Sequence, residues 1–102
     1  MAKITIPETF RLLNTTWTVR QDKDAELHEV ADAFGMCFLS KQELWVKSTL
    51  VPEMKRQVFY HELAHALLEM SNQNDLSKDE AVIELLGTML CQYHDTKRGS
   101  LQ

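Results

Sequence analysis

Cysteine, proline, glycine and clustered positive charge are all scarce in this chain of 102 residues. Its two cysteines, Cys37 and Cys91, do not form a CxxC pair and are too few for a disulfide scaffold. We therefore expect two buried free thiols in a reducing compartment. Because the chain has only 3 glycines and 2 prolines, most of it is expected to form regular helices and strands.

The charge balance and the short apolar runs argue against two classes of partner. The formal net charge is -4 and the basic residues are scattered, which disfavours nucleic acid and anionic membranes, because phosphate contacts require clustered lysine and arginine. No apolar run approaches the roughly 18 residues of a membrane span. Residues 1–10 lack the charged start and apolar stretch of a signal peptide. We expect a cytoplasmic protein that binds neither nucleic acid nor membrane.

The length and the apolar periodicity predict one α+β domain. A chain of this size suits a single domain over residues 1–102, with 96–102 as a frayed polar tail. Residues 15–20 alternate, with Trp17 and Val19 on one face, and predict a half-buried strand. Two further strands are predicted at 36–40 and 43–48, joined as a hairpin. The predicted fold is a small antiparallel sheet of about three strands, followed by two long helices.

Helical spacing of apolar residues predicts three helices. A short one covers 25–34 and is closed by Gly35. Pro52 marks the start of a long helix that runs to about Met70, with a core stripe of Phe59, Leu63, Ala66 and Met70. After a polar loop at 71–76, Ser77 begins a second long helix that ends near 93–95. Its predicted apolar face is Val82, Leu85, Leu86, Met89 and Leu90.

The segment at 61–65 reads HELAH and is the most specific chemical signal in the sequence. On a helix, His61 and His65 lie one turn apart on one face, so both imidazoles can reach one Zn²⁺ at about 2.0–2.1 Å. Glu62 is rotated by about 100° from His61, so it can take a proton from a metal-bound water instead of binding the metal. The alternative is a helix with two exposed histidines and a surface glutamate. The apolar residues that flank the motif disfavour it, because they predict a largely buried helix.

A catalytic zinc site of this kind needs a third protein ligand from another element. The candidates are Glu80, Glu84, Asp79 and His94. Ser77 to Glu80 also fits an S-x-x-E capping box, which taken alone favours Glu84 as the ligand. His94 lies roughly 21 Å along the helix axis from Glu80, so the two cannot share a metal. We expect His94 to be an exposed histidine at a helix end.

Gly87 indicates how the second long helix meets the first. A glycine in the middle of a helix costs about 1 kcal/mol relative to alanine. A close approach of the two helices would explain it. That approach would also bring a carboxylate of the second helix to the metal.

Residues 58–65 (VFYHELAH) and 79–88 (DEAVIELLGT) resemble the zincin metallopeptidases. Their gluzincin branch pairs HExxH with a downstream N-E-x-x-x-D helix, in which the Glu is the third ligand and the acid four residues later hydrogen-bonds a metal-bound histidine. The resemblance implies that Glu80 is the ligand and that Glu84 steadies a histidine. Asp79 stands in place of the asparagine, and Glu84 in place of the aspartate.

The layout is also similar to small phage and mobile-element proteins of the ImmA/IrrE type, which place a short sheet before an HExxH helix and a Glu-bearing helix after it. This likeness covers about residues 12–95 and implies a protein substrate, often a repressor. The chain is shorter than most members, and no transition-state residue is assignable. Its candidates are Tyr60, Tyr93, His28 and His94.

Together these features predict a zinc-dependent metallopeptidase that hydrolyses a peptide bond in a protein or peptide substrate. Glu62 would act as general base and then return the proton to the leaving amine. We expect a substrate strand to pair with an exposed sheet edge at 43–48. The alternative is a zinc-binding, catalytically inactive protein-interaction module, which the missing transition-state residue favours and the intact Glu62 disfavours. A metal-free helical interaction module is a third reading.

Overall fold

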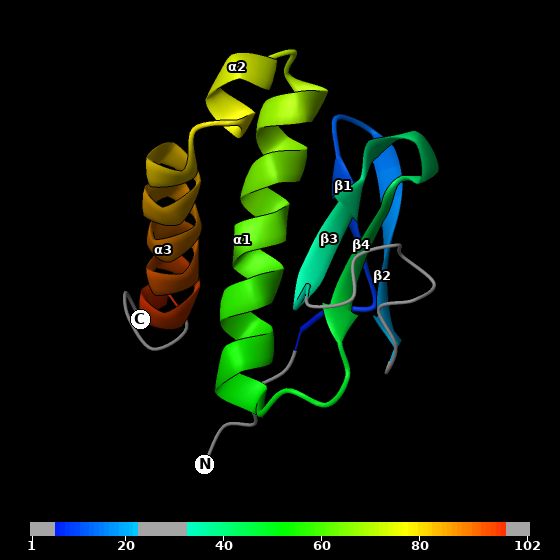
Figure 1. Cartoon of the computed structure of the whole chain (residues 1–102), viewed down its shortest axis with the longest axis vertical. Coiled ribbons are helices and arrows are strands. Elements are labelled where there is room, and N and C mark those ends of the chain that lie inside the picture. The colour runs from blue at the N-terminus through cyan, green and yellow to red at the C-terminus, as the bar shows by residue number, and fades with distance from the viewer. Residues whose placement is uncertain (1–5, 23–32, 98–102) are drawn as a thin grey trace.

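The protein is built in three layers, a sheet and two long helices, with one helix in the middle (Figure 1). The computed structural model describes residues 6–22 and 33–97. Helix α1 (Pro52–Met70) contacts the sheet on one side and α3 (Glu80–Lys97) on the other. The short helix α2 (Asn74–Ser77) connects the two at one end. The fold class is α+β, as the sequence predicts.

Within the described residues, the sheet has four strands in the order β1-β2-β4-β3. They are β1 (Thr9–Leu12), β2 (Thr15–Asp22), β3 (Gly35–Phe38) and β4 (Glu43–Lys47). The outer pairs β1–β2 and β3–β4 are antiparallel, whereas the central pair β2–β4 is parallel. The prediction of about three antiparallel strands is therefore wrong in the strand number and in one pairing. Pairing between strands distant in sequence is decided by tertiary contacts, which local periodicity does not report.

The sequence pattern did not predict β1, because the turn that joins this strand to β2 has an uncommon sequence. Leu13 and Asn14 alone connect β1 to β2, and both have positive φ, 48° and 65°. Two consecutive left-handed residues are the requirement of a type I′ hairpin turn, whose usual signal is Asn-Gly or Asp-Gly. A leucine in the first position hides that signal.

The hairpin predicted for the next two strands is confirmed, with shifted bounds. Strands β3 and β4 pair with Gly35 opposite Val46. A short 3-10 turn at Leu39–Lys41 and a left-handed Gln42 (φ 54°) connect them. The predicted helix at 25–34 falls mainly on residues 23–32, outside the described part of the chain. Its predicted cap is wrong, because Gly35 begins β3 and the two residues before it are not helical.

Strand β4 is an inner strand, which corrects the predicted docking edge at 43–48. It pairs with β2 on one side and with β3 on the other. Its backbone hydrogen-bonding groups are therefore already used. Among the described strands, β3 is the outermost on that side of the sheet.

The first long helix is confirmed from Pro52 to Met70, with proline in its first turn. The predicted start of the second at Ser77 is wrong, because Ser77 ends α2 and α3 begins at Glu80. Asp79 caps α3, since its Oδ1 accepts the backbone N–H groups of Ala81 at 3.0 Å and Val82 at 3.4 Å. Helix α3 continues to residue 97, so the described start of the predicted tail at 96 is helical.

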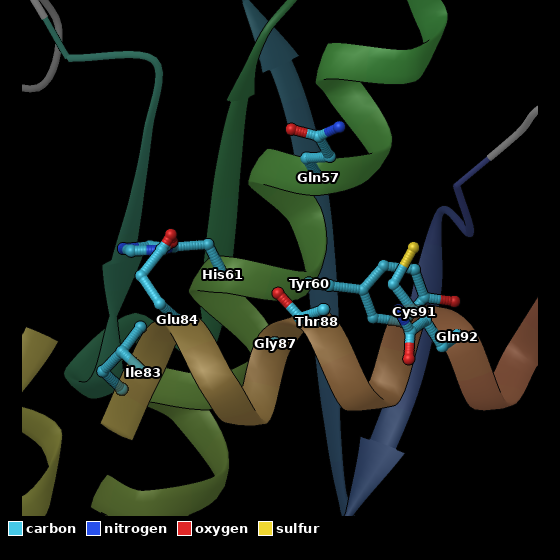
Figure 2. A pocket seen from close by; sticks show the side chains of 9 residues that line it. All are labelled: Gln57, Tyr60, His61, Ile83, Glu84, Gly87, Thr88, Cys91 and Gln92. Carbon is cyan, nitrogen blue, oxygen red and sulfur yellow. The ribbon is translucent and has the colours of Figure 1, made fainter. Parts of the chain in front are cut away.

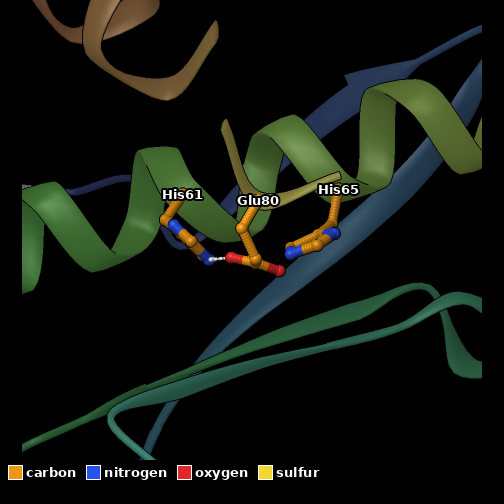
Figure 3. Close-up of side chains that lie close together, drawn as sticks. All are labelled: His61, His65 and Glu80. Carbon is orange, nitrogen blue, oxygen red and sulfur yellow. Dashed lines mark ion pairs between the residues drawn. The ribbon is translucent and has the colours of Figure 1, made fainter. Parts of the chain in front are cut away.

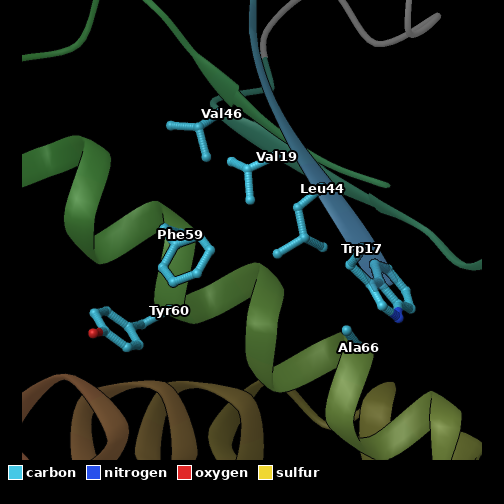
Figure 4. Close-up of a cluster of buried hydrophobic side chains, with 7 residues drawn as sticks. All are labelled: Trp17, Val19, Leu44, Val46, Phe59, Tyr60 and Ala66. Carbon is cyan, nitrogen blue, oxygen red and sulfur yellow. The ribbon is translucent and has the colours of Figure 1, made fainter. Parts of the chain in front are cut away.

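The core lies between α1 and the inner face of the sheet (Figure 4). Trp17 and Val19 are buried and their neighbours Thr16 and Thr18 are exposed, so the predicted alternation of β2 is confirmed. Phe59 of α1 packs on this face. The full cluster of buried residues is Trp17, Val19, Leu44, Val46, Phe59, Tyr60 and Ala66.

The burial of both long helices departs from a single apolar stripe. Helix α1 is covered on two sides, so its buried residues are spread around it and include a glutamate: Phe59, Tyr60, Glu62, Ala64 and Ala66. Helix α3 turns Ile83 and Gly87 inward and leaves Leu85 and Met89 63% and 56% exposed, which corrects part of its predicted apolar face. Among the described helices, none combines the length and the apolar character needed to cross a membrane.

Candidate metal centre

Helix α1 holds the two histidines of the HELAH segment beside each other. The ring centroids of His61 and His65 are 5.2 Å apart, as expected for positions separated by one turn. The two side chains are 30% and 17% exposed. Burial, followed by the proximity of His61, lowers the pKa of His65. A lowered pKa favours the neutral imidazole, which is the form that binds metal.

The carboxylate of Glu80 points at these two rings. One donor atom from each of His61, His65 and Glu80 lies within 4.8 Å of the others, and Glu80 Oε1 is 3.7 Å from His61 Nε2. Figure 3 shows the carboxylate between the two imidazoles. Of the described residues, these are the ones that form a group of metal-ligand type.

The cap of α3 fixes the position of Glu80. Asp79 accepts the first backbone N–H groups of α3, so Glu80 is the first residue of the helix and its side chain projects toward α1. The capping box that would have engaged Glu80 does not form. The Ser77 backbone N–H instead donates to Gln73 O at 3.0 Å. Glu80 is therefore not used in capping.

Gly87 allows α3 to lie close against α1 near the histidines. A Cβ atom at position 87 would be 3.2 Å from the Tyr60 carbonyl oxygen and 3.4 Å from the His61 nitrogen. These distances are at or below ordinary contact, and the neighbouring atoms belong to the α1 backbone. The close helix approach predicted from this glycine is confirmed.

Glu84 lies one turn after Glu80 and faces the other nitrogen of His61. Its Oε2 is 3.7 Å from His61 Nδ1, whereas Glu80 approaches Nε2. The two acids thus approach opposite nitrogens of one ring. Both are largely exposed, at 70% and 66% of their side-chain surface, so water weakens their electrostatic attraction to the ring.

Among the residues that the structure describes, Glu62 is one of two buried polar or charged residues, with 8% of its surface exposed. Burial, with Glu80 and Glu69 nearby, raises the pKa of its carboxyl to about 8. A cation bound by His61 and His65 would oppose this shift, because an opposite charge favours the ionised carboxylate. Glu62 therefore belongs to the same electrostatic cluster as the candidate ligands.

Two cavities meet at His61. One of about 400 Å³ contains Glu62 and Glu80, and runs along α1 to Gly35 at the start of β3. The other, of about 340 Å³, lies between α1 and α3 (Figure 2). His61 and Glu84 stand at one end of it and Cys91 at the other. The first cavity is the one that joins His61 and Glu80 to Glu62 and to the outer strand.

His65 also contacts Ser77 and, through it, Glu69, and neither contact was predicted from the sequence. The Ser77 hydroxyl oxygen is 2.8 Å from His65 Nδ1, and the same hydroxyl donates to Glu69 Oε2 at 2.8 Å. Glu69 follows His65 by four residues on α1, so the helical repeat was a signal that could have revealed it. No comparable spacing links Ser77 to His65. The S-x-x-E pattern instead predicted that Ser77 caps the second long helix.

The proposed transition-state candidates do not gather at the two histidines. The Tyr60 hydroxyl bonds His94 Nδ1, and Figure 2 shows the Tyr60 ring pointing away from His61, toward Cys91. His94 is exposed near the end of α3, as predicted, and Tyr93 is 63% exposed. His28 lies outside the described residues. Burial raises the pKa of Tyr60, although Arg56 opposes this shift.

The residues present fit a zinc ion. Two imidazole nitrogens and one carboxylate oxygen form the His₂Glu set that holds catalytic zinc in several peptidases and leaves a fourth position open. Ligands of a tetrahedral zinc lie roughly 3.3 Å apart. The donor atoms here are within 4.8 Å, and the exposed Glu80 side chain can close the difference.

Comparison with known proteins adds no assignment. No protein-family model, no curated protein and no solved structure matches the chain. The functional argument therefore rests on the residues of the site themselves.

Proposed function

We propose that this protein is a zinc-dependent metallopeptidase that hydrolyses a peptide bond in a protein or peptide substrate. One observation carries the proposal. Donor atoms of His61, His65 and Glu80 lie within 4.8 Å of one another, and the buried Glu62 lines the same cavity as His61 and Glu80. A metal site with a structural role alone has no use for such a base.

The chain's residues divide into those that bind and those that move a proton. His61 and His65 supply nitrogen ligands and Glu80 supplies an oxygen ligand, while Glu84 stands behind His61. Zinc held by three protein ligands supplies a Lewis acid and lowers the pKa of water to about 7. Glu62 accepts a proton at its carboxylate and passes it to the leaving amine.

Support for an extended substrate comes from the position of β3. This strand is the outermost described strand on its side, and Gly35 at its start lines the cavity that contains Glu62. An extended peptide can pair with such an edge through backbone hydrogen bonds, which gives affinity with little sequence selectivity. Phe34, Met54 and Val58 also line this cavity and offer apolar contact to substrate side chains.

A zinc-binding interaction module without catalytic activity is the second candidate. One observation favours it: the Tyr60 hydroxyl bonds His94, and the Tyr60 ring points away from His61 (Figure 2). A peptidase site commonly places a hydrogen-bond donor at the developing oxyanion. This candidate predicts bound zinc without turnover.

The experiment that tests the proposal compares the wild-type protein with Glu62→Gln. Zinc content is measured by elemental mass spectrometry on the purified protein. Cleavage is measured by mass spectrometry after incubation with a mixture of unstructured peptides. We expect both proteins to bind one zinc per chain. Only the wild type should cleave, because an amide at position 62 cannot accept the proton.

Glu53→Gln is the matched control, since Glu53 is an exposed residue of the first turn of α1. It should keep both zinc and cleavage. Equal cleavage by wild type and Glu62→Gln would contradict the mechanism. Stoichiometric zinc without cleavage by the wild type would favour the interaction module.

A further inference from the structure

Ser77 connects His65 to Glu69 through a buried hydroxyl. The Ser77 side chain is at the end of α2, and only 4% of the residue is exposed. Its oxygen lies 2.8 Å from His65 Nδ1 and 2.8 Å from Glu69 Oε2. His65 Nδ1 and Glu69 Oε2 are themselves 4.0 Å apart, so the serine bridges two groups that do not bond directly.

The direction of these hydrogen bonds follows from the groups involved. A hydroxyl has one hydrogen to donate, and a carboxylate only accepts. Ser77 gives its hydrogen to Glu69. Toward His65 the serine oxygen can then only accept, so Nδ1 must carry the hydrogen. The unprotonated nitrogen of the neutral ring is Nε2, and its lone pair is available to a metal.

Ser77 has no competing role in the backbone. Its N–H is satisfied by Gln73 O at 3.0 Å, and the cap of α3 is provided by Asp79. Burying a hydroxyl costs free energy unless it is hydrogen-bonded. The contacts with His65 and Glu69 account for its burial.

We propose that Ser77, oriented by Glu69, is a positioning residue that holds His65 in the Nδ1–H tautomer and directs Nε2 toward the metal. This inference rests on the metal-binding part of the proposed function. Partners of this kind fix the tautomer and the ring orientation of metal-bound histidines, and their removal lowers metal affinity by roughly 10–100-fold. Ser77 touches neither metal nor substrate and acts through His65 alone.

The test has two readouts, the tautomer of His65 in the zinc-free protein and the affinity for Zn²⁺. Ring nitrogen NMR shifts report which nitrogen carries the hydrogen. Competition with a chromophoric chelator gives the affinity. We expect Nδ1–H in the wild type. In Ser77→Ala we expect loss of this preference and a fall in Zn²⁺ affinity of about 10–100-fold. Ser77→Thr restores the hydroxyl and should recover both readouts.

Ser71→Ala is the matched control. The Ser71 hydroxyl donates to Leu67 O at 2.9 Å at the exposed end of α1, so this variant loses a serine hydrogen bond without touching His65. It should leave both readouts unchanged. Glu69→Ala keeps Ser77 but frees its hydrogen for Nδ1, so it should give a mixture of tautomers even if Ser77→Ala fails to fold.

The outcomes separate this inference from the proposed peptidase. If Ser77→Ala and Glu69→Ala both keep the Nδ1–H tautomer and bind Zn²⁺ within about twofold of wild type, the positioning role is wrong, whatever the peptide assay gives. If Glu62→Gln still cleaves while Ser77→Ala loses Zn²⁺ affinity, the peptidase mechanism fails and the positioning role stands. A wild-type protein that binds no Zn²⁺ overturns both.

Discussion

Gly87 of α3 packs directly against the backbone of His61, so that a Cβ atom at position 87 would lie 3.4 Å from the His61 nitrogen. This contact sets the spacing between the helix that carries the two histidines and the helix that carries Glu80. The site thus depends on a residue without a side chain. Enlarging that residue should disturb metal binding as well as packing.

Gly87→Leu should push α3 away from α1. We expect the free energy of unfolding to fall by about 1–3 kcal/mol, as overpacking does, and Zn²⁺ affinity to fall at least about tenfold, because Glu80 moves with α3. Urea denaturation and chelator competition measure the two effects. Thr88→Leu enlarges the exposed neighbouring position and should change stability by less than about 0.5 kcal/mol. Equal effects of both variants would argue against a special contact at position 87.

The two acids of α3 should differ in their effect on the metal. Glu80→Ala removes a proposed ligand and should lower Zn²⁺ affinity by more than about 100-fold, whereas Glu84→Gln alters a neighbour of the proposed ligand His61 and should lower it by about tenfold. The reason is that Glu80 joins the group with both histidines, while Glu84 approaches only His61 Nδ1. The reverse order of effects would identify Glu84 as the ligand.

Zinc should stabilise the folded protein because its proposed ligands come from two helices. Binding to the native state alone contributes about 2.7 kcal/mol when free Zn²⁺ is 100 times its dissociation constant. For a domain of about 100 residues this raises the melting temperature by roughly 10–20 °C. Calorimetry with Zn²⁺ and with a chelator measures the difference. In His65→Ala the increase should largely vanish, and an unchanged increase would place the metal elsewhere.

We predict that position 35 cannot accommodate a side chain without loss of stability. A Cβ atom there would lie 2.4 Å from Val58 Cγ1 and 2.9 Å from the Trp45 carbonyl oxygen. Gly35→Ala should therefore lower the free energy of unfolding by about 1–3 kcal/mol. In a Val58→Ala background the penalty should shrink without vanishing, because the Trp45 backbone remains. A double-mutant cycle by urea denaturation gives the coupling, and strictly additive effects would contradict the contact.

Cys37 should react slowly with iodoacetamide. Burial, with Glu69 and Glu62 nearby, raises the pKa of its thiol to about 12. At pH 8 this lowers the thiolate fraction by about 1000-fold relative to a thiol with the ordinary value of 9.0. The pKa of the Cys37 thiol is higher in the folded protein than in the unfolded chain. Its contribution to the free energy of unfolding is therefore complete below pH 9 and is lost as pH rises toward 12.

Labelling of Cys91→Ser isolates the rate at Cys37. The same variant in urea serves as the control, since the unfolded thiol should regain ordinary reactivity. Both cysteines are free, but each is only partly buried, which corrects the predicted full burial. Equal rates in the folded and unfolded protein would contradict a shielded thiol at position 37.

The helices and the histidine pair were readable from the chain because they depend on neighbours in sequence. Pro52 set the start of α1, and the spacing of His61 and His65 put both rings on one face before any tertiary contact was considered. Gly87 predicted a close approach of α3 to α1, because a glycine in the middle of a helix destabilises that helix relative to alanine. Each of these signals spans a few helical turns at most.

The remaining features could be identified only from the folded structure. The parallel pairing of β2 with β4 removed 43–48 from the sheet edge, and Asp79 took the cap that the sequence had assigned to Ser77. Ser77 became the partner of His65, from a different helix. Local periodicity put His61 and His65 on one face of a helix, whereas Glu80 was implied by the resemblance to zincins. Only tertiary packing decided what surrounds them, because contacts between distant segments depend on how whole layers meet.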